Sequence, residues 1–557
     1  MTDFSYRRRK TSATRVGNIL IGGDNPIVIQ SMTSTSTMDT PGSVEQIISI
    51  VKAGGQLVRL TAQGVREADN LAVISRGVAE RGVDVPLVAD IHFNPAAAFA
   101  AVRAGVAKVR INPGNFVDPG RTFRQLEYTD EEYAAELRRL ADAFVPFLEE
   151  CRQHGTAIRL GVNHGSLSDR IMSRYGDTPE GMVESAMEFL RVAARCNFND
   201  IVISIKASNV VVMTRTVSLL AEAMDREGFR YPLHLGVTEA GDGEDGRVKS
   251  AVGIGSLLVD GLGDTIRVSL SEDPASEIPE AARIVDYIGR RADAPAVVVD
   301  VEYRPLRSVK TPLVASFEDG DFDGDCRPDL IVDPSAPMLD AADVISMTLE
   351  DVADVIDGLK IIYLTSSHPD FVGSMRAALS QLATAGVNVP VIGINNYSNM
   401  TAEDVVINAS IDMGTLLLEG SLDGIAIGSD TMSAAECCRL AFGILQATRL
   451  RITRSEFIAC PGCGRTLFDL RTTLQRVRRA TGHLKGLKIG VMGCIVNGPG
   501  EMADADYGYV GAAAGKVSLY KGKTAIERNI PEDAAIEKLI DLLKDNGDWV
   551  EPTSDCQ

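Results

Sequence analysis

Short apolar runs, each followed by a longer amphipathic stretch, recur through the first 290 residues. Such runs alternating with helices are typical of parallel strands buried on both faces. Eight strand–helix units in fewer than 300 residues predict a closed (β/α)₈ TIM barrel rather than an open sheet. The eight predicted strands are Pro26–Ser31, Gln56–Thr61, Pro86–His92, Lys108–Asn112, Ala157–Asn163, Asp200–Ala207, Leu233–Glu239 and Thr265–Leu270.

A second α/β pattern follows and predicts an inserted domain, which we interpret as an incomplete copy of the barrel. Its helices include Ala434–Thr448. We expect a TIM-barrel substrate domain at 1–292, an α/β spacer domain at 293–450 and an α+β domain at 451–557. The predicted strands of the insertion are Pro312–Phe317, Leu330–Asp333, Ile361–Thr365, Val389–Asn395, Leu416–Glu419 and Gly424–Ile427.

Charge and composition exclude several classes of protein. The 557 residues are 45% hydrophobic and 24% charged, which is the balance of a globular protein. A net charge of −20 argues against nucleic acid as a partner, and residues 301–450, with 22 acidic and 8 basic side chains, carry most of it. No apolar run reaches about 20 residues, so no membrane span is expected. The basic N-terminus has no apolar run behind it, and a cytoplasmic location is therefore expected.

Polar side chains gather at the carboxyl ends of the predicted barrel strands, where a barrel builds its active site. Four arginines and a lysine with few acids predict a pocket for a multiply charged anion, most simply a diphosphate. A single buried arginine serves as often in a structural ion pair, but contributions from seven strands are hard to explain in that way. These residues are Arg59, Asp90, His92, Arg110, Asn112, Arg159, Asn163, Lys206, Asn209, Glu239, Arg267 and Ser269.

Glycines near the last crossover give two further signals. Gly253–Gly255 and Gly261–Gly263 match the phosphate-binding loops that often follow barrel strands seven and eight. Gly241–Gly246 fits the dinucleotide pattern GxGxxG, but its Asp242 and Asp245 would repel a pyrophosphate. We therefore expect no dinucleotide site there.

Three cysteines near the C-terminus form a metal-binding pattern. Cys460 and Cys463 share a Pro/Gly turn, and Cys494 lies in a second glycine-rich turn. Two thiolates on one tight turn suit Zn²⁺ or an iron–sulfur cluster. With no fourth Cys or His at matching spacing, three thiolates and the carboxylate of Glu501 suit a [4Fe-4S] cluster with one iron open to substrate. A zinc ribbon and a redox dithiol remain alternatives.

These motifs resemble the flavodoxin- or ferredoxin-dependent 4-hydroxy-3-methylbut-2-enyl diphosphate synthase family in its longer, three-domain form. The resemblance covers residues 15–290 and 451–545, and the insertion carries few of its motifs. The matching segments are 22–26, 30–32, 89–93, 110–115, 159–163, 204–208, 237–241, 264–269, CPGCGRT at 460–466 and MGCIVNGPGE at 492–501.

The resemblance implies a two-electron reductive ring opening and dehydration of 2-C-methyl-D-erythritol 2,4-cyclodiphosphate in the non-mevalonate isoprenoid pathway. By similarity, Cys460, Cys463, Cys494 and Glu501 hold a [4Fe-4S] cluster, and the barrel cations with Asn163 and Ser269 bind the cyclic diphosphate. Glu239 is the expected proton donor to the leaving hydroxyl. Flavodoxin or ferredoxin is the expected electron donor, and the resemblance leaves a homodimer open.

Two other classes of protein remain in competition. One is a non-redox barrel enzyme that acts on a phosphorylated substrate and carries a structural zinc. The other is a cluster-bearing electron carrier without catalysis, which would leave the convergent barrel cations unexplained. An iron–sulfur absorption band bleached by dithionite separates the first class from the redox enzyme. Perturbation of the cluster's EPR signal by substrate separates the second.

Overall fold

The computed structural model describes residues 1–117, 127–302, 313–315, 330–332, 346–347, 362–386, 390–494, 502 and 504–552. The backbone forms two compact units. The larger comprises residues 9–246, 262–282 and 454–557, and the smaller comprises residues 1–8, 247–261 and 283–453. The predicted boundaries at 292 and 450 stay predictions. Among the described residues, no helix combines the length and apolar character needed to cross a membrane.

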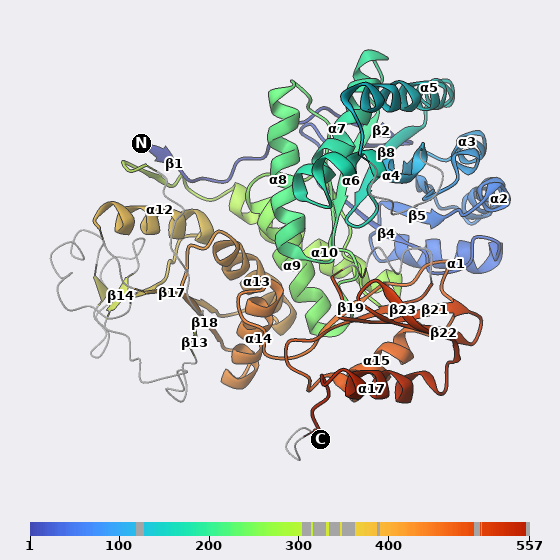
Figure 1. The fold of residues 1–557 in the computed structure, drawn as a ribbon. Helices are drawn as coiled ribbons and strands as arrows, with labels where there is room; N and C mark the ends of the chain where they lie inside the picture. The colour runs from blue at the N-terminus through green and yellow to red at the C-terminus, as the bar shows by residue number, and fades with distance from the viewer. Residues whose placement is uncertain are drawn as a thin grey trace. The chain divides into compact units, whose positions relative to one another are not determined.

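The larger unit contains the predicted barrel, and all eight predicted strands are confirmed (Figure 1). The parallel strands run in the order β10-β11-β4-β5-β6-β7-β8-β9. A parallel bridge between Ile203 and Leu233 joins β9 to the start of β10 and closes the circle. The strands are β4 (Val28–Met32), β5 (Leu57–Thr61), β6 (Leu87–Asp90), β7 (Lys108–Ile111), β8 (Ala157–Asn163), β9 (Ile201–Lys206), β10 (His234–Leu235) and β11 (Thr265–Ile266).

A short hairpin, β2 (Thr14–Val16) and β3 (Ile19–Ile21), covers the amino end of the barrel. Val16 and Ile21 pack against the first residues of the strands, including Leu57 and Val88. Because this end is filled with apolar side chains, the open end is the carboxyl one. The helices after the strands are α1 (Thr40–Lys52), α2 (Val65–Glu80), α3 (Pro95–Arg103), α4 (Pro113–Phe116), α5 (Asp130–His154), α6 (Asp169–Tyr175), α7 (Pro179–Arg195), α8 (Val210–Arg226), α9 (Gly243–Val259), the 3₁₀ turn η1 (Pro274–Ser276) and α10 (Glu277–Ala292).

The smaller unit holds a six-stranded parallel sheet in the order β13-β18-β17-β16-β14-β15, besides the two-stranded ribbon β1 (Thr2–Asp3) and β12 (Val298–Val299). The predicted strand Leu416–Glu419 is wrong, because this run ends α13, where nearly every residue is buried. A short apolar run cannot distinguish a strand from a fully buried helix. The elements are β13 (Leu313–Ala315), β14 (Leu330–Val332), β15 (Ser346–Met347), β16 (Ile362–Leu364), α12 (Phe371–Thr384), β17 (Val391–Tyr397), α13 (Ala402–Leu418), β18 (Gly424–Ser429) and α14 (Ala434–Ala447).

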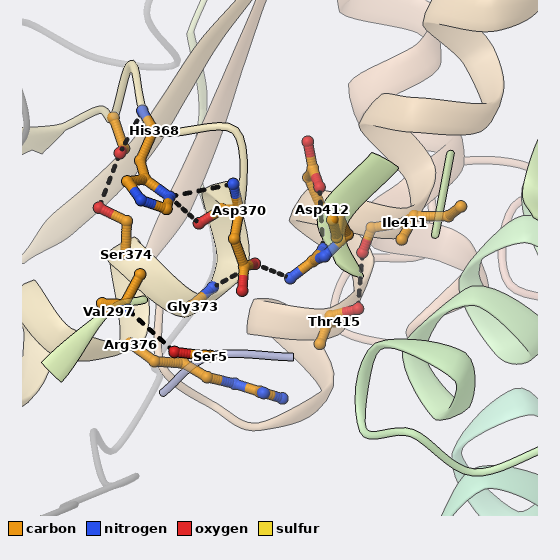
Figure 2. Close-up of polar contacts among 12 residues, drawn as sticks. Ser5, Val297, His368, Asp370, Gly373, Ser374, Arg376, Ile411, Asp412 and Thr415 are labelled. Carbon is orange, nitrogen blue, oxygen red and sulfur yellow. Dashed lines mark hydrogen bonds and ion pairs between the residues drawn. The ribbon is translucent and has the colours of Figure 1, made fainter. Parts of the chain in front are cut away.

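Polar contacts fix the start of α12 in this unit (Figure 2). Asp370 is the N-cap, and its carboxylate accepts from the Gly373 N–H at 3.0 Å and pairs with Arg291 of α10. Asp412 of α13 accepts from the Tyr287 hydroxyl at 2.6 Å. Burial raises the pKa of Asp412 to about 6, against the opposing effect of Arg291. The unit therefore uses its buried charges as structural pairs.

The C-terminal part of the larger unit is the predicted α+β domain. Strands β19, β20 and β21 are parallel, and β21, β22 and β23 are antiparallel. Leu474 of α15 and Leu539 of α17 pack on one face of this sheet. The elements are β19 (Glu456–Ala459), α15 (Leu470–Thr481), β20 (Lys488–Met492), β21 (Tyr507–Ala513), β22 (Lys516–Lys521), β23 (Thr524–Pro531) and α17 (Ala535–Asp545).

The predicted phosphate loops at Gly253–Gly255 and Gly261–Gly263 are wrong. Gly253 and Gly255 lie inside α9, and the second pair precedes β11, at the closed end of the barrel. Gly255 instead lets α9 approach α13, because a Cβ on it would lie 2.3 Å from the side chain of Ile411. The glycine spacing therefore reflects helix packing and not anion binding.

Gly255→Ala should destabilise the protein, because the added methyl group overlaps Ile411. Overpacking costs about 1–3 kcal/mol, which exceeds the gain in helix propensity of about 1 kcal/mol. Gly289→Ala is the matched control, since a Cβ at this exposed position of α10 meets nothing within 4 Å. Thermal unfolding should show a lower midpoint for Gly255→Ala and an equal or higher one for Gly289→Ala. Equal midpoints for the two variants would contradict the close helix packing.

Candidate functional site

A cavity at the carboxyl end of the barrel brings the predicted barrel residues and the predicted cysteines together. Nine of the predicted barrel residues line it, and so do three cysteines of the C-terminal domain. The lining is Arg59, Asp90, Arg110, Arg159, Asn163, Lys206, Glu239, Arg267 and Ser269 from the barrel, with Cys460, Cys463 and Cys494.

Arg110 organises one wall of the cavity. Its guanidinium donates to the Asp90 carboxylate at 3.2 Å and to the Asn163 amide oxygen at 2.7 Å. The same group contacts Nδ1 of His92 at 2.8 Å, and Asn112 lies 3.4 Å from the other ring nitrogen. His92 and Asn112 are absent from the cavity lining, and they contact it through Arg110, which His92 touches directly.

The other cations differ in how far protein groups already satisfy them. Arg267 pairs with the buried Glu277 through two contacts of 3.0 and 3.1 Å. The Lys206 ammonium donates to the carbonyl of Gly236 at 3.1 Å. Arg59 donates to the sulfur of Met32 at 3.1 Å, which is a weak acceptor. Arg59 and Lys206 thus retain donors for an anion.

Burial and mutual repulsion dominate the electrostatics of this cavity. Burial, helped by nearby Arg267 and Arg110, lowers the pKa of Arg59 to about 10. Burial, together with repulsion from Arg159, Arg59 and Arg267, holds the pKa of Lys206 well below its usual range. Burial would raise the pKa of Asp90, but the surrounding arginines outweigh it and lower that pKa. A bound polyanion would relieve this repulsion.

The three cysteines lie on two turns at the carboxyl ends of β19 and β20. Cys460 Sγ accepts a hydrogen bond from the Gly493 N–H at 3.3 Å, which ties the first turn to the second. Burial raises the pKa of the Cys460 thiol, and the nearby Cys463 and Cys494 raise it further. A bound cationic metal centre would instead lower the pKa of the Cys460 thiol, because thiolates are the ligating form.

Within the described residues, no group of three or more Cys, His, Asp or Glu side chains is arranged to hold a single metal ion. The three thiols nevertheless line one cavity. Cysteine thiolates are the ligands that hold iron–sulfur clusters, so this donor set fits such a cluster.

Besides His92 and Asn112, a third predicted barrel residue, Asn209, is not among the lining residues. Asn209 is the N-cap of α8, where its side chain accepts from the Val211 and Val212 N–H groups. An Asn just after a strand serves a helix cap as readily as a ligand, and substrate binding by Asn209 stays a prediction. Glu501 lies outside the described residues.

The structure also adds lining residues that the pattern at the strand ends did not reveal. Arg465 reaches the cavity from the C-terminal domain and is close enough to lower the pKa of Asp90, although burial opposes it. The sequence feature that could have pointed to Arg465 is its position two residues after Cys463. Met32 and Thr238 also line the cavity, and apolar or hydroxyl side chains of this kind carry no charge pattern to reveal them.

Comparison with known proteins gives two family matches and several close relatives. Residues 11–282 match the GcpE TIM-barrel domain, and residues 456–545 match the GcpE protein C-terminal domain. Proteins named 4-hydroxy-3-methylbut-2-en-1-yl diphosphate synthase (flavodoxin) are similar over almost the whole chain. The Bacteroides fragilis protein is 52% identical, covering 99% of this chain and 98% of its own length.

Two more relatives carry the same name. The Parabacteroides distasonis protein is 52% identical and covers 99% of this chain and 100% of its own length. The Leptospira interrogans protein is 40% identical and covers 100% of this chain and 99% of its own length. With both domain matches and identities of 40–52% along the full chain, this protein belongs to the GcpE family.

Proposed function

We propose that the cavity catalyses the reductive ring opening and dehydration of 2-C-methyl-D-erythritol 2,4-cyclodiphosphate to (E)-4-hydroxy-3-methylbut-2-enyl diphosphate. The relatives are named for this product. The observation that carries the proposal is a single cavity lined both by cations and by three cysteines. The protein is an iron–sulfur oxidoreductase of the isoprenoid pathway.

The barrel side of the cavity would hold the diphosphate. Six cationic side chains and two carboxylates line the cavity, so a ligand with several negative charges balances the excess. Arg59 and Lys206 have donors to spare, whereas Asp90 and Glu277 orient Arg110 and Arg267. Arg159 lines the same wall, and Asn163 and Ser269 supply polar contacts to hydroxyl or phosphate oxygens.

Cys460, Cys463, Cys494 and Glu501 would hold a [4Fe-4S] cluster, with Glu501 as the exchangeable ligand. When bound, the cluster supplies two electrons to the substrate carbon skeleton. The ring C–O bond to phosphate breaks, and the hydroxyl leaves as water after it takes up a proton. The three cysteines face the barrel cavity of the same chain, which supports a reaction within one subunit.

Glu239 is the proposed proton donor to the leaving hydroxyl. Its side chain is buried among the cations and lines the cavity. The C-terminal domain contacts its backbone, since the Ala459 N–H donates to the Glu239 carbonyl at 3.3 Å. The C-terminal domain thus covers the mouth and excludes water from the reacting atoms.

We further propose flavodoxin as the electron donor, since the relatives carry flavodoxin in their names. Ferredoxin remains the alternative donor. A cytoplasmic location and a homodimer stay predictions. Anaerobic purification with iron and sulfide analysis, followed by turnover of the cyclic diphosphate with a chemical reductant, tests the proposed function directly.

Lys206→Met should weaken substrate binding, because it removes a buried hydrogen-bond donor that lines the cavity. A hydrogen bond to a charged group contributes about 1.5–3 kcal/mol, so KM should rise about 10- to 150-fold. Lys108→Met is the matched control, since Lys108 is equally buried in the barrel but does not line the cavity. Steady-state kinetics of the two variants should differ, and an equal KM would contradict the assignment of Lys206.

Lys108→Met should also stabilise the fold at neutral pH. Burial, with Arg159 and Arg59 nearby, lowers the pKa of Lys108 well below its ordinary 10.5, and its ammonium has no hydrogen-bond partner among the described residues. The unfolded chain binds more protons than the folded one between these two pKa values, so wild-type stability rises with pH there. The advantage of the variant, measured by thermal unfolding, should therefore shrink as pH approaches 10.5. A constant advantage would contradict this titration.

Glu501→Ala should leave three thiolates on the cluster, so that iron is retained less firmly and turnover is lost. Cys463→Ser sets the lower bound of iron content and turnover, since it removes a thiolate and should lose most of the iron. Cys196→Ser sets the upper bound, because this free cysteine lies in the barrel away from the cavity. Iron content and turnover after anaerobic purification provide the measurements. Full activity and iron content in Glu501→Ala would refute its role as a ligand.

A further inference from the structure

The segment 239–245, which follows β10 at the mouth of the barrel, is held in an unfavourable conformation. Glu239 has a φ of 51°, in the left-handed region that a residue with a Cβ adopts rarely. Such a conformation persists only where the surroundings hold it in place. Because Glu239 lines the cavity, whatever holds this segment also sets the position of its carboxylate.

Backbone contacts to the C-terminal domain hold the first half of the segment. Ala459 of β19 pairs in parallel with Ala240, and its N–H donates to the carbonyl of Glu239. The Gly241 carbonyl accepts from the Ser271 N–H at 2.8 Å, and the Ser271 hydroxyl donates to the Cys460 carbonyl at 2.9 Å. The C-terminal domain therefore contacts the backbone on which Glu239 stands.

Charged contacts hold the second half. Arg478 of α15 pairs with Asp242 at 2.7 Å and with Asp245 at 3.2 Å, and Arg454 also pairs with Asp245. The Arg478 guanidinium lies 5.2 Å from the centre of the Phe457 ring. The Asp242 side chain is only 14% exposed, so this pairing is less screened than that of surface charges.

These contacts give the GxGxxG segment a role. Asp242 and Asp245, whose charges exclude a pyrophosphate, are the partners of an arginine from the other domain. Its fork of donors suits two carboxylates at once, which a lysine could not match. The acidic turn that carries Asp242 and Asp245 therefore binds Arg478.

We infer that Arg478 is a positioning residue: by binding Asp242 and Asp245 it seats the C-terminal domain on segment 239–245 and fixes Glu239 in the cavity. The inference rests on the proposed role of Glu239 as proton donor. Arg478 itself does not line the cavity and touches no reacting atom. Its loss should therefore impair proton delivery more than substrate binding.

The test compares Arg478→Gln with Arg479→Gln in the full-length, cluster-loaded protein. Arg479 is exposed on the same helix and makes no ion pair with a described residue, so it controls for lost charge. With a chemical reductant, Arg478→Gln should lower kcat about tenfold with KM nearly unchanged, and the solvent deuterium isotope effect on kcat should rise. Arg478→Lys should recover part of kcat. Hydrogen exchange should show faster exchange at the Ala459 amide in Arg478→Gln alone.

A double-mutant cycle with Glu239→Gln tests whether the effect passes through Glu239. Residues that act as one unit are not additive, so Arg478→Gln should have little further effect on kcat in the Glu239→Gln background. An additive loss, an unchanged kcat in Arg478→Gln, or an equal loss in Arg479→Gln would overturn the inference. Wild-type turnover and iron content, measured in the same series, report separately on the proposed function. A Glu239→Gln variant with full kcat would overturn the inference while that function stands.

Discussion

The excess of buried positive charge at the barrel mouth is the constraint on which the rest of the site depends. Charges removed from water are unfavourable unless they are paired, and here six cations share a cavity with two carboxylates. Asp90 and Glu277 each fix one arginine, but Arg59 and Lys206 are left with weak or neutral acceptors. The closed end of the barrel, in contrast, is filled with apolar side chains.

The same constraint explains why the site is built from both the barrel and the C-terminal domain. Under the proposed function the bound anion must meet the three cysteines in one cavity, and the barrel supplies five of the six cations but none of these cysteines. Arg465 adds one more cation from the cysteine side. The acidic turn at Asp242 and Asp245 lies just outside the cavity, where it pairs with Arg478 instead of neutralising the anion site.

The sequence predicted the barrel and most of the lining because both follow from local rules. The apolar strands are buried on both faces. The polar residues at their carboxyl ends converge at the barrel mouth whatever the details of side-chain packing. Apart from the local helix cap at Asn209, what the sequence pattern missed depends on partners distant in the chain. Leu416–Glu419 is a helix end because α13 is buried on all sides, and Gly255 serves a helix contact that only the folded chain reveals. Asn209 caps α8, the helix that follows it. Arg465 lines the cavity only because the C-terminal domain contacts the barrel.

The hydrogen bond from Ser271 to Cys460 has a consequence for how the chain is assembled. The two residues are 189 positions apart, and the predicted insertion at 293–450 accounts for most of that separation. Closing a flexible loop costs entropy that grows only with the logarithm of its length, so the insertion adds roughly 1.5 kcal/mol to this closure. A contact of such long range slows folding more than it weakens the folded state. A ribosome must also release the whole insertion before the barrel mouth can be covered, so the cavity forms in two stages separated by the synthesis of the intervening chain.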